Sequence, residues 1–224
     1  MYLDAGTYAN GVPMSTGKRL SRAEKQAATR AAILKAAADV FTAIGYDAAT
    51  VDGITEAAGF SRGAFYSNFE SKDELFLTLI ELRIEGSLSD IAAAFSTGKG
   101  LVDRLQAGGE FLEALVAKDR QWCLLYMEFW SRAVRDPGLQ RRFADQYQLW
   151  RAGIAETIER QSRDLEIQLD APSQELASAL IALFEGHVLQ RLIDPKAFEA
   201  GFFTRLLLRF FASLPSQPSS AEPG

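Results

Sequence analysis

Residues 50–75 carry side chains whose types and spacing are suited to contact with nucleic acid. Two short segments with one apolar side each are separated by Gly59, which can adopt the left-handed conformation that ends a helix. Thr50 and Ser61 are both good N-cap residues, so each can begin one of two helices. The pattern predicts a helix-turn-helix, a motif whose second helix lies in the major groove of DNA.

The second of these helices is expected to have a buried side and a free side. Phe65 and Phe69 are four residues apart and should both face inward. The polar residues between and before them, Arg62 and Tyr66 among them, are then left facing elsewhere. Arg62 is the most capable reader of base edges, because a guanidinium group can pair bidentately with guanine.

The order of residues in this segment resembles the tetracycline-repressor (TetR) family of bacterial transcription regulators. A Tyr-x-x-Phe-x-x-Lys run follows the turn, and residues 29–45 resemble the first helix of the family. The specific resemblance covers residues 22–82, and beyond them only a general all-helical pattern is shared. The matching positions are Arg30, Ile33, Ala37, Phe41, Gly45, Thr50, Ile54, Ala57, Ala58, Gly59, Ser61, Gly63, Tyr66, Phe69, Lys72 and Leu75.

The resemblance implies a double-stranded DNA partner with an inverted-repeat operator. It implies phosphate contacts by Thr50, Tyr66 and Lys72, with Arg30 as a further candidate. Gly53 stands where a polar helix former is common in the family. Several residues of the second helix of the motif, the reading helix, also differ from those common in the family. The operator preference of a relative therefore cannot be transferred to this chain. The residues expected to meet or flank base edges are Ser61, Arg62, Gly63, Ala64, Ser67 and Asn68.

The charge distribution is compatible with DNA binding although the net charge of the chain is −5. Residues 15–35 hold six cations against one anion, whereas the chain from Phe76 onward holds 16 cations and 20 anions. Phosphate binding is local, because charges farther away than roughly 8 Å are screened at physiological salt. For DNA binding, the positive charge of residues 15–35 beside the predicted reading helix therefore matters more than the negative charge of the rest of the chain.

The remaining sequence predicts an all-α fold, with a three-helix DNA-binding domain and a larger helical domain for ligand binding and dimerisation. Asp136-Pro137 and Asp194-Pro195 each place a cap before a proline, so a new helix should begin at each pair. The expected helices of the larger domain cover residues 72–95, 101–117, 120–135, 137–163, 173–193 and 195–214. The expected division is a disordered arm at 1–20, the DNA-binding domain at 21–70, the larger domain at 71–214, and a disordered tail at 215–224.

The middle helices are unusually rich in aromatic side chains, and all three tryptophans fall there. Aromatic residues at helical spacing are more often plain core than pocket lining, but tryptophan and tyrosine also need polar partners. An aromatic pocket with a few polar groups is a common form of small-molecule site, and the resemblance implies a ligand cavity in this region. We therefore expect an apolar or aromatic effector bound by Phe111, Trp122, Tyr126, Phe129, Trp130 and Trp150.

The last two expected helices carry an apolar band that is wider than the single stripe of a surface helix. Such a band should be buried on two sides, one of them against a second molecule, although a helix central to a large monomeric core would look similar. The resemblance implies a four-helix dimer interface, and a helix-turn-helix usually needs two copies to read its site. The residues expected at this homodimer interface are Leu180, Phe184, Val188, Phe203, Leu206 and Phe210.

Other classes of function find little support. The single cysteine, Cys123, cannot form an internal disulfide, and no apolar run approaches the ~20 residues of a membrane helix. The N-terminal residues also lack the basic-then-apolar order of a signal peptide, so we expect a cytoplasmic protein. Nothing in the sequence brings Cys123 near His187 as a catalytic pair, and no spacing suits a metal, so neither an enzyme nor a cofactor is expected. The alternatives left open are a DNA-binding dimer controlled by a partner or by nothing, and an α-helical enzyme or carrier of apolar molecules.

Overall fold

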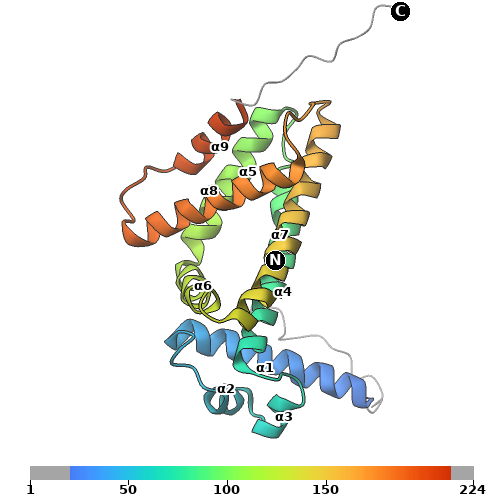
Figure 1. The fold of residues 1–224 in the computed structure, drawn as a ribbon, viewed down its shortest axis with the longest axis vertical. Helices are drawn as coiled ribbons and strands as arrows, with labels where there is room; N and C mark the ends of the chain where they lie inside the picture. The colour runs from blue at the N-terminus through green and yellow to red at the C-terminus, as the bar shows by residue number, and fades with distance from the viewer. Residues whose placement is uncertain (1–20, 213–224) are drawn as a thin grey trace, which may run out of the picture. The chain divides into compact units, whose positions relative to one another are not determined.

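The structure is a computed structural model that describes residues 21–212. The regular structure within this range is entirely helical, as expected (Figure 1). The helices are α1 (Arg22–Ile44), α2 (Val51–Ala58), α3 (Arg62–Tyr66), α4 (Lys72–Ala94), α5 (Leu101–Lys118), α6 (Arg120–Ala133), α7 (Pro137–Asp164), α8 (Ser173–Ile193) and α9 (Phe202–Ala212). The arm expected at 1–20 and the tail expected at 215–224 lie outside the described residues.

The chain divides into two compact units, Met1–Arg83 and Ile84–Gly224. The first unit therefore reaches beyond residue 70, where the sequence had suggested a domain boundary. The reason is that the opening turns of α4 pack into it: Leu75, Phe76 and Ile80 are all buried. Helix α4 thus begins in the first unit and continues into the second.

The core of the first unit is built around aromatic rings. Phe41 of α1, Tyr46 after α1 and Phe76 of α4 are each at most 1% exposed. The Phe76 ring lies 5.1 Å from both of the others in edge-on geometry, a preferred arrangement of aromatic pairs. Helix α1 begins at a complete capping box, because the Ser21 hydroxyl accepts from the backbone of Glu24 and the Glu24 carboxylate accepts from the backbone of Ser21.

The second unit is organised by two helix pairs, in which α8 packs on α7 and α9 packs on α5 (Figure 1). Ala155 and Ile158 of α7 meet Leu176 and Ala177 of α8 in one buried cluster. Another cluster joins one residue of α5 with two of α9: Leu112, Phe203 and Leu207.

The start of α9 differs from the sequence prediction. The expected start at the Asp194-Pro195 pair is wrong, because residues 194–201 form turns in which the Asp194 carboxylate accepts from the backbone of Lys196. By contrast, Asp136 does cap a helix that begins at Pro137, as predicted. Helix α9 begins only after Gly201, whose positive φ of 76° suits glycine.

The cap of α9 comes from a different helix. The Glu113 carboxylate of α5 accepts hydrogen bonds from the backbone N–H groups of Gly201, Phe203 and Thr204, at 2.8, 2.7 and 3.2 Å. A negative group at a helix N-terminus satisfies orphan donors and suits the helix dipole. Gly109 lets the two helices meet this closely, since a Cβ there would lie 2.8 Å from the Thr204 Cα.

Replacing Glu113 with alanine should therefore destabilise the second unit. The change leaves three partly buried N–H groups without an acceptor, and we expect a loss of about 1–3 kcal/mol in the free energy of unfolding. Urea denaturation followed by circular dichroism measures it. Glu110→Ala, an exposed residue of the same helix, is the control and should change stability by less than about 0.5 kcal/mol. Equal effects of the two changes would contradict this account of α9.

Candidate nucleic-acid interface and apolar pocket

Helices α2 and α3 are joined by a tight turn that local sequence dictates. The Thr50 hydroxyl accepts from the backbone of Gly53 at 3.1 Å and begins α2. Gly59 ends it with a φ of 73°, in the left-handed region that favours glycine. The Ser61 hydroxyl then accepts from the backbone of Ala64 at 3.2 Å and begins α3. The predicted helix-turn-helix is present, with both predicted caps in use.

The two phenylalanines of the reading segment face inward, as predicted. Phe65 is fully buried, Phe69 is 2% exposed, and their ring centroids are 5.7 Å apart. Burial of this side leaves the opposite side of the motif open to solvent. The predicted DNA-contacting residues that are exposed there are Thr50, Ser61, Arg62, Gly63, Tyr66 and Ser67, with Ala64 partly buried.

Arg62 stands at the centre of this exposed side. Its guanidinium donates to Asp52 at 3.2 Å and to the Tyr66 hydroxyl at 3.4 Å. These two neighbours, Tyr66 first, raise the pKa of Arg62 further above its already high value. The Arg62 and Asp52 side chains are 60% and 66% exposed, and such surface pairs contribute little free energy. Arg62 can therefore exchange Asp52 for another acceptor at small cost.

Two of the predicted contact residues act inside the first unit instead of pointing outward. The Arg30 guanidinium donates to the Asn68 carbonyl at 2.8 Å and lies 4.1 Å above the Phe69 ring. The Asn68 side-chain amide donates to the Ala64 carbonyl, and its Oδ1 is buried. Arg30 thus ties α1 to the end of α3. The Asn68 amide is turned into the chain in this structure, and its contact with base edges stays a prediction.

Lys72 also has partners within the chain. Its amino group donates to the backbone carbonyls of Tyr46 and Ala49, both at 2.8 Å, and lies 4.3 Å from the Tyr46 ring. These bonds hold the segment between α1 and α2 against the start of α4. Nothing in the local sequence indicates this role, because the partners are 26 and 23 residues away. The exposed cations on the described part of the basic segment are Arg22, Lys25 and Lys35.

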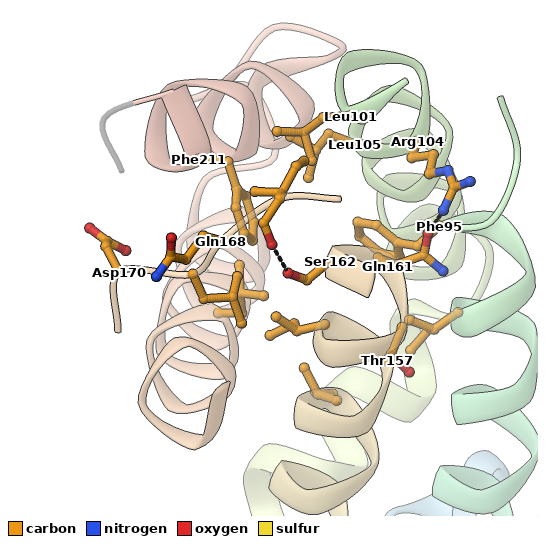
Figure 2. A pocket seen from close by; sticks show the side chains of 16 residues that line it. Phe95, Leu101, Arg104, Leu105, Thr157, Gln161, Ser162, Gln168, Asp170 and Phe211 are labelled. Carbon is orange, nitrogen blue, oxygen red and sulfur yellow. Dashed lines mark hydrogen bonds between the residues drawn. The ribbon is translucent and has the colours of Figure 1, made fainter. Parts of the chain in front are cut away.

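The second unit contains an apolar pocket of about 240 Å³. Figure 2 shows Phe211 of α9 and Phe95, which directly follows α4, on either side of it. Arg104 is among the few polar lining groups; its side chain is 14% exposed and pairs with Asp164 at 3.5 Å. The full lining is Ile91, Phe95, Leu101, Arg104, Leu105, Ile154, Thr157, Ile158, Gln161, Ser162, Ile167, Gln168, Leu169, Asp170, Leu180 and Phe211.

The six aromatic residues predicted to bind a ligand lie elsewhere. None of Phe111, Trp122, Tyr126, Phe129, Trp130 and Trp150 lines this pocket. Phe129 is fully buried with its ring 5.6 Å from that of Phe143, so it packs as a core residue in this structure. Trp130, by contrast, is 42% exposed. Sequence reasoning missed the pocket because its walls are ordinary aliphatic residues drawn from several helices and a loop.

The residues predicted at a dimer interface pack within their own chain. Phe203 and Val188 are 1% and 7% exposed, so both pack in the core of the single chain. The other four, Leu180, Phe184, Leu206 and Phe210, are partly buried against the two core clusters of the second unit. The large apolar side chains that α8 does expose are Leu189 and Ile193, at 47% and 78%, and neither was singled out from the sequence.

His187 has no hydrogen-bond partner on either ring nitrogen and is 3% exposed. Its ring lies 5.2–5.8 Å from those of Phe198, Phe202 and Phe203. Burial lowers the pKa of His187, which favours the neutral imidazole. The surroundings are those of a core histidine.

Comparison with known proteins assigns both units. Residues 33–79 match the family described as bacterial regulatory proteins, tetR family, and residues 102–215 match the C-terminal domain of BetI-type transcriptional repressors. The HTH-type transcriptional repressor Rv1474c of Mycobacterium tuberculosis is 31% identical over 178 residues, which cover 78% of this chain and 89% of the relative.

Solved structures share the fold. A TetR-family regulator from Mesorhizobium loti superposes with a TM-score of 0.69 at 19% identity, covering 86% of this chain and 98% of the other. The regulator FadR from Bacillus subtilis, solved in complex with stearoyl-CoA, superposes with a TM-score of 0.63 at 14% identity, covering 82% and 97%. At these identities the likeness concerns the fold alone.

Proposed function

This chain belongs to the tetR family of bacterial regulatory proteins, and we propose that it is a cytoplasmic repressor that binds an inverted-repeat operator as a homodimer and leaves it when a small apolar ligand binds. Its general role as a DNA-binding transcriptional regulator is that of the family. The observation that carries the proposal is the exposed side of α2 and α3, held outward by the buried Phe65 and Phe69. Gel-shift binding to the DNA upstream of its own gene is the primary test.

Arg62 provides a sharper test than Lys72, because Lys72 also supports the fold of the first unit. Arg62→Ala removes an exposed guanidinium without touching the core. We expect reduced preference at particular base pairs, by about 1–3 kcal/mol each, because bidentate pairing with guanine is lost. Fluorescence anisotropy with operator variants measures the preference.

The control for Arg62→Ala is Arg142→Ala, which removes an exposed arginine of α7. This variant should bind every operator variant like the parent. A parental pattern of base preference in Arg62→Ala would show that the reading helix has been misassigned.

The proposed dimer rests on the exposed apolar side of α8. Length and composition alone would allow α8 to cross a membrane, the only described helix of which this holds, but a core helix passes the same test. Only 28% of its most apolar 18-residue stretch is buried within the chain. Cover by the same helix of a second copy would bury the exposed Leu189 and Ile193. It would also supply two reading helices about 34–36 Å apart, or a multiple of that distance.

A charge on this side of α8 should therefore split the dimer. The double variant Leu189→Asp and Ile193→Asp places carboxylates on residues that are exposed in a single chain, so each chain should still fold. Burying them in an interface would cost several kcal/mol, and we expect monomers at micromolar concentration by light scattering. Leu206 and Phe210 are less suitable positions, because they pack within the chain.

The control for the α8 variant is Leu149→Asp, which charges an exposed leucine of α7. It should remain dimeric. A dimer that persists in the double variant would exclude α8 as the interface.

The ligand proposal rests on the apolar pocket of the second unit. FadR of Bacillus subtilis was solved with an acyl-CoA, which supports an apolar effector here as well. Ile91 and Phe95 line the pocket at the end of α4, and the first turns of the same helix pack in the DNA-binding unit. A ligand can empty the operator only if it binds more tightly to a conformation that binds DNA poorly, and α4 connects the two units for such a change.

Filling the pocket should block binding of apolar molecules. Ile167→Trp introduces a larger side chain from the loop between α7 and α8, where overpacking is better tolerated than inside a helix pair. We expect the apolar dye N-phenyl-1-naphthylamine to bind at least about tenfold more weakly, because its space is taken. Dye fluorescence titration gives the affinity.

Val102→Trp is the matched control, since Val102 is 61% exposed and lies outside the pocket. It should bind the dye like the parent. Unchanged dye affinity in Ile167→Trp would place the apolar site elsewhere, while gel shifts of both variants would show whether DNA binding is preserved.

A further inference from the structure

The only histidine of the chain lies where α8 packs against the start of α9. His187 is 3% exposed. Its ring is nearly parallel to those of Phe202 and Phe203, at interplanar angles of 22° and 27°, and lies 5.3 Å from that of Phe198 in the turn before α9. A proton added to His187 would therefore place a positive charge inside the contact between the two helices.

The surroundings of His187 are poorly suited to that charge. Among residues 21–212, neither ring nitrogen has a hydrogen-bond partner, and the buried hydroxyl of Thr204 on α9 has none either. An imidazolium donates from both nitrogens, so protonation would bury two donors without acceptors. The faces of Phe202 and Phe203 attract a cation, but they offset only part of the cost of a buried charge. Burial is accordingly the main cause that lowers the pKa of His187.

Two charged groups act on the His187 ring, and they oppose each other. Arg191, one turn further along α8, lowers the pKa of His187, and Glu113 of α5 raises it. Arg120 of α6 donates to a backbone carbonyl at the end of α8. The charged side chains of the turn and of α9 are exposed, namely Asp194, Lys196, Glu199, Arg205 and Arg209. A protonated His187 would therefore be drawn to Glu113.

The Glu113 carboxylate is already engaged. It accepts hydrogen bonds from three backbone N–H groups at the start of α9 and so caps that helix. A protonated His187 either keeps its charge unpaired, which favours exposure of the ring to solvent, or pulls the Glu113 carboxylate away from those donors. Both routes weaken the docking of α9.

We propose that His187 is a proton sensor that releases α9 from α8 and α5 in acid. At neutral pH the uncharged imidazole packs as one more aromatic ring. Protonation makes its burial unfavourable, and α9 then loses its packing and its cap together. The second unit, which contains the apolar pocket, thereby becomes sensitive to acid. This device does not depend on DNA binding, so it can fail or succeed apart from the repressor proposal.

The direction of the pH dependence follows from the protons bound in each state. Once α9 is released, an exposed His187 has the ordinary imidazole pKa of about 6.5, whereas the docked His187 has a lower pKa. The released state binds more protons between these two values, so docking is strongest above about pH 6.5 and weakens as the pH falls below it. Burial raises the pKa of Glu185 on the same helix, which has the opposite effect and favours the folded state in acid.

Hydrogen exchange of the untagged full chain at pH 7.5 and 5.5, read by mass spectrometry, tests the proposal. Rates are expressed relative to unstructured peptides at the same pH. Protection of the α9 amides should fall about five- to tenfold at pH 5.5, which lies about one unit below the pKa of an exposed imidazole. His187→Leu removes the titrating group and keeps an apolar side chain of similar size, so its α9 protection should be the same at both pH values.

Gln174→Leu is the matched control, because it introduces the same side chain at an exposed position in the first turn of α8. It should keep the loss of protection in acid. A second measurement serves where His187→Leu fails to fold by circular dichroism. All imidazole NMR signals of the parent come from one residue, so their pH titration gives the pKa of His187 directly, and it should lie below about 6.5.

Three outcomes would overturn the proposal. The first is equal α9 protection of the parent at both pH values, and the second is a parental loss of protection in His187→Leu. The third is an imidazole pKa of about 6.5 or higher in the parent, since the proton would then not oppose docking. A loss of protection spread evenly over α5 to α9 would also count against it, because acid would then destabilise the whole unit and not the contact of α9.

Discussion

The DNA-binding unit depends on the burial of one side of a helix that is too short to exist alone. Helix α3 has five residues, whereas isolated helices shorter than about 12–15 residues are marginal in water. Its conformation is therefore imposed by the burial of Phe65 and Phe69 and by the caps at its ends. The outward direction of Arg62 and Tyr66 follows from that burial. Loss of the Phe65 and Phe69 packing would therefore also disrupt the exposed surface that carries Arg62 and Tyr66.

The features that sequence predicts well are local ones. Caps, the left-handed glycine of the turn and the i, i+4 phenylalanines are determined within a few residues, and the structure confirms them. The bonds of Arg30 and Lys72 join residues 23 to 48 positions apart, and no local pattern contains them. Both cations were expected to face phosphates, yet each also holds the unit together. A basic residue near a reading helix can thus support the fold through partners in its own chain.

Prediction was less complete in the second unit, for physical reasons. The Asp-Pro signal was right at Pro137 and wrong at Pro195, because a local cap cannot reveal that the chain needs Glu113 of another helix to begin α9. The apolar pocket is formed by aliphatic side chains that look like any core. The aromatic residues of the middle helices were predicted from the sequence to line a ligand pocket, but part of this group is core, as the fully buried Phe129 shows. The phenols of Tyr126 and Tyr147 meet the Glu185 carboxylate in this cluster, a contact that exists only because α6, α7 and α8 come together.

The carboxylate that caps α9 from outside has a consequence for the motions of the second unit. Because the first N–H groups of α9 find their acceptor only on α5, undocking this helix also removes its start signal. Docking and helix formation are then one cooperative event, so the backbone amides of α9 should exchange with solvent as a group. Phe211 carries this event into the apolar pocket, which would lose a wall whenever the helix melts. Opening of the pocket on this side would therefore require local unfolding of α9 and not a rigid movement of the helix about a hinge.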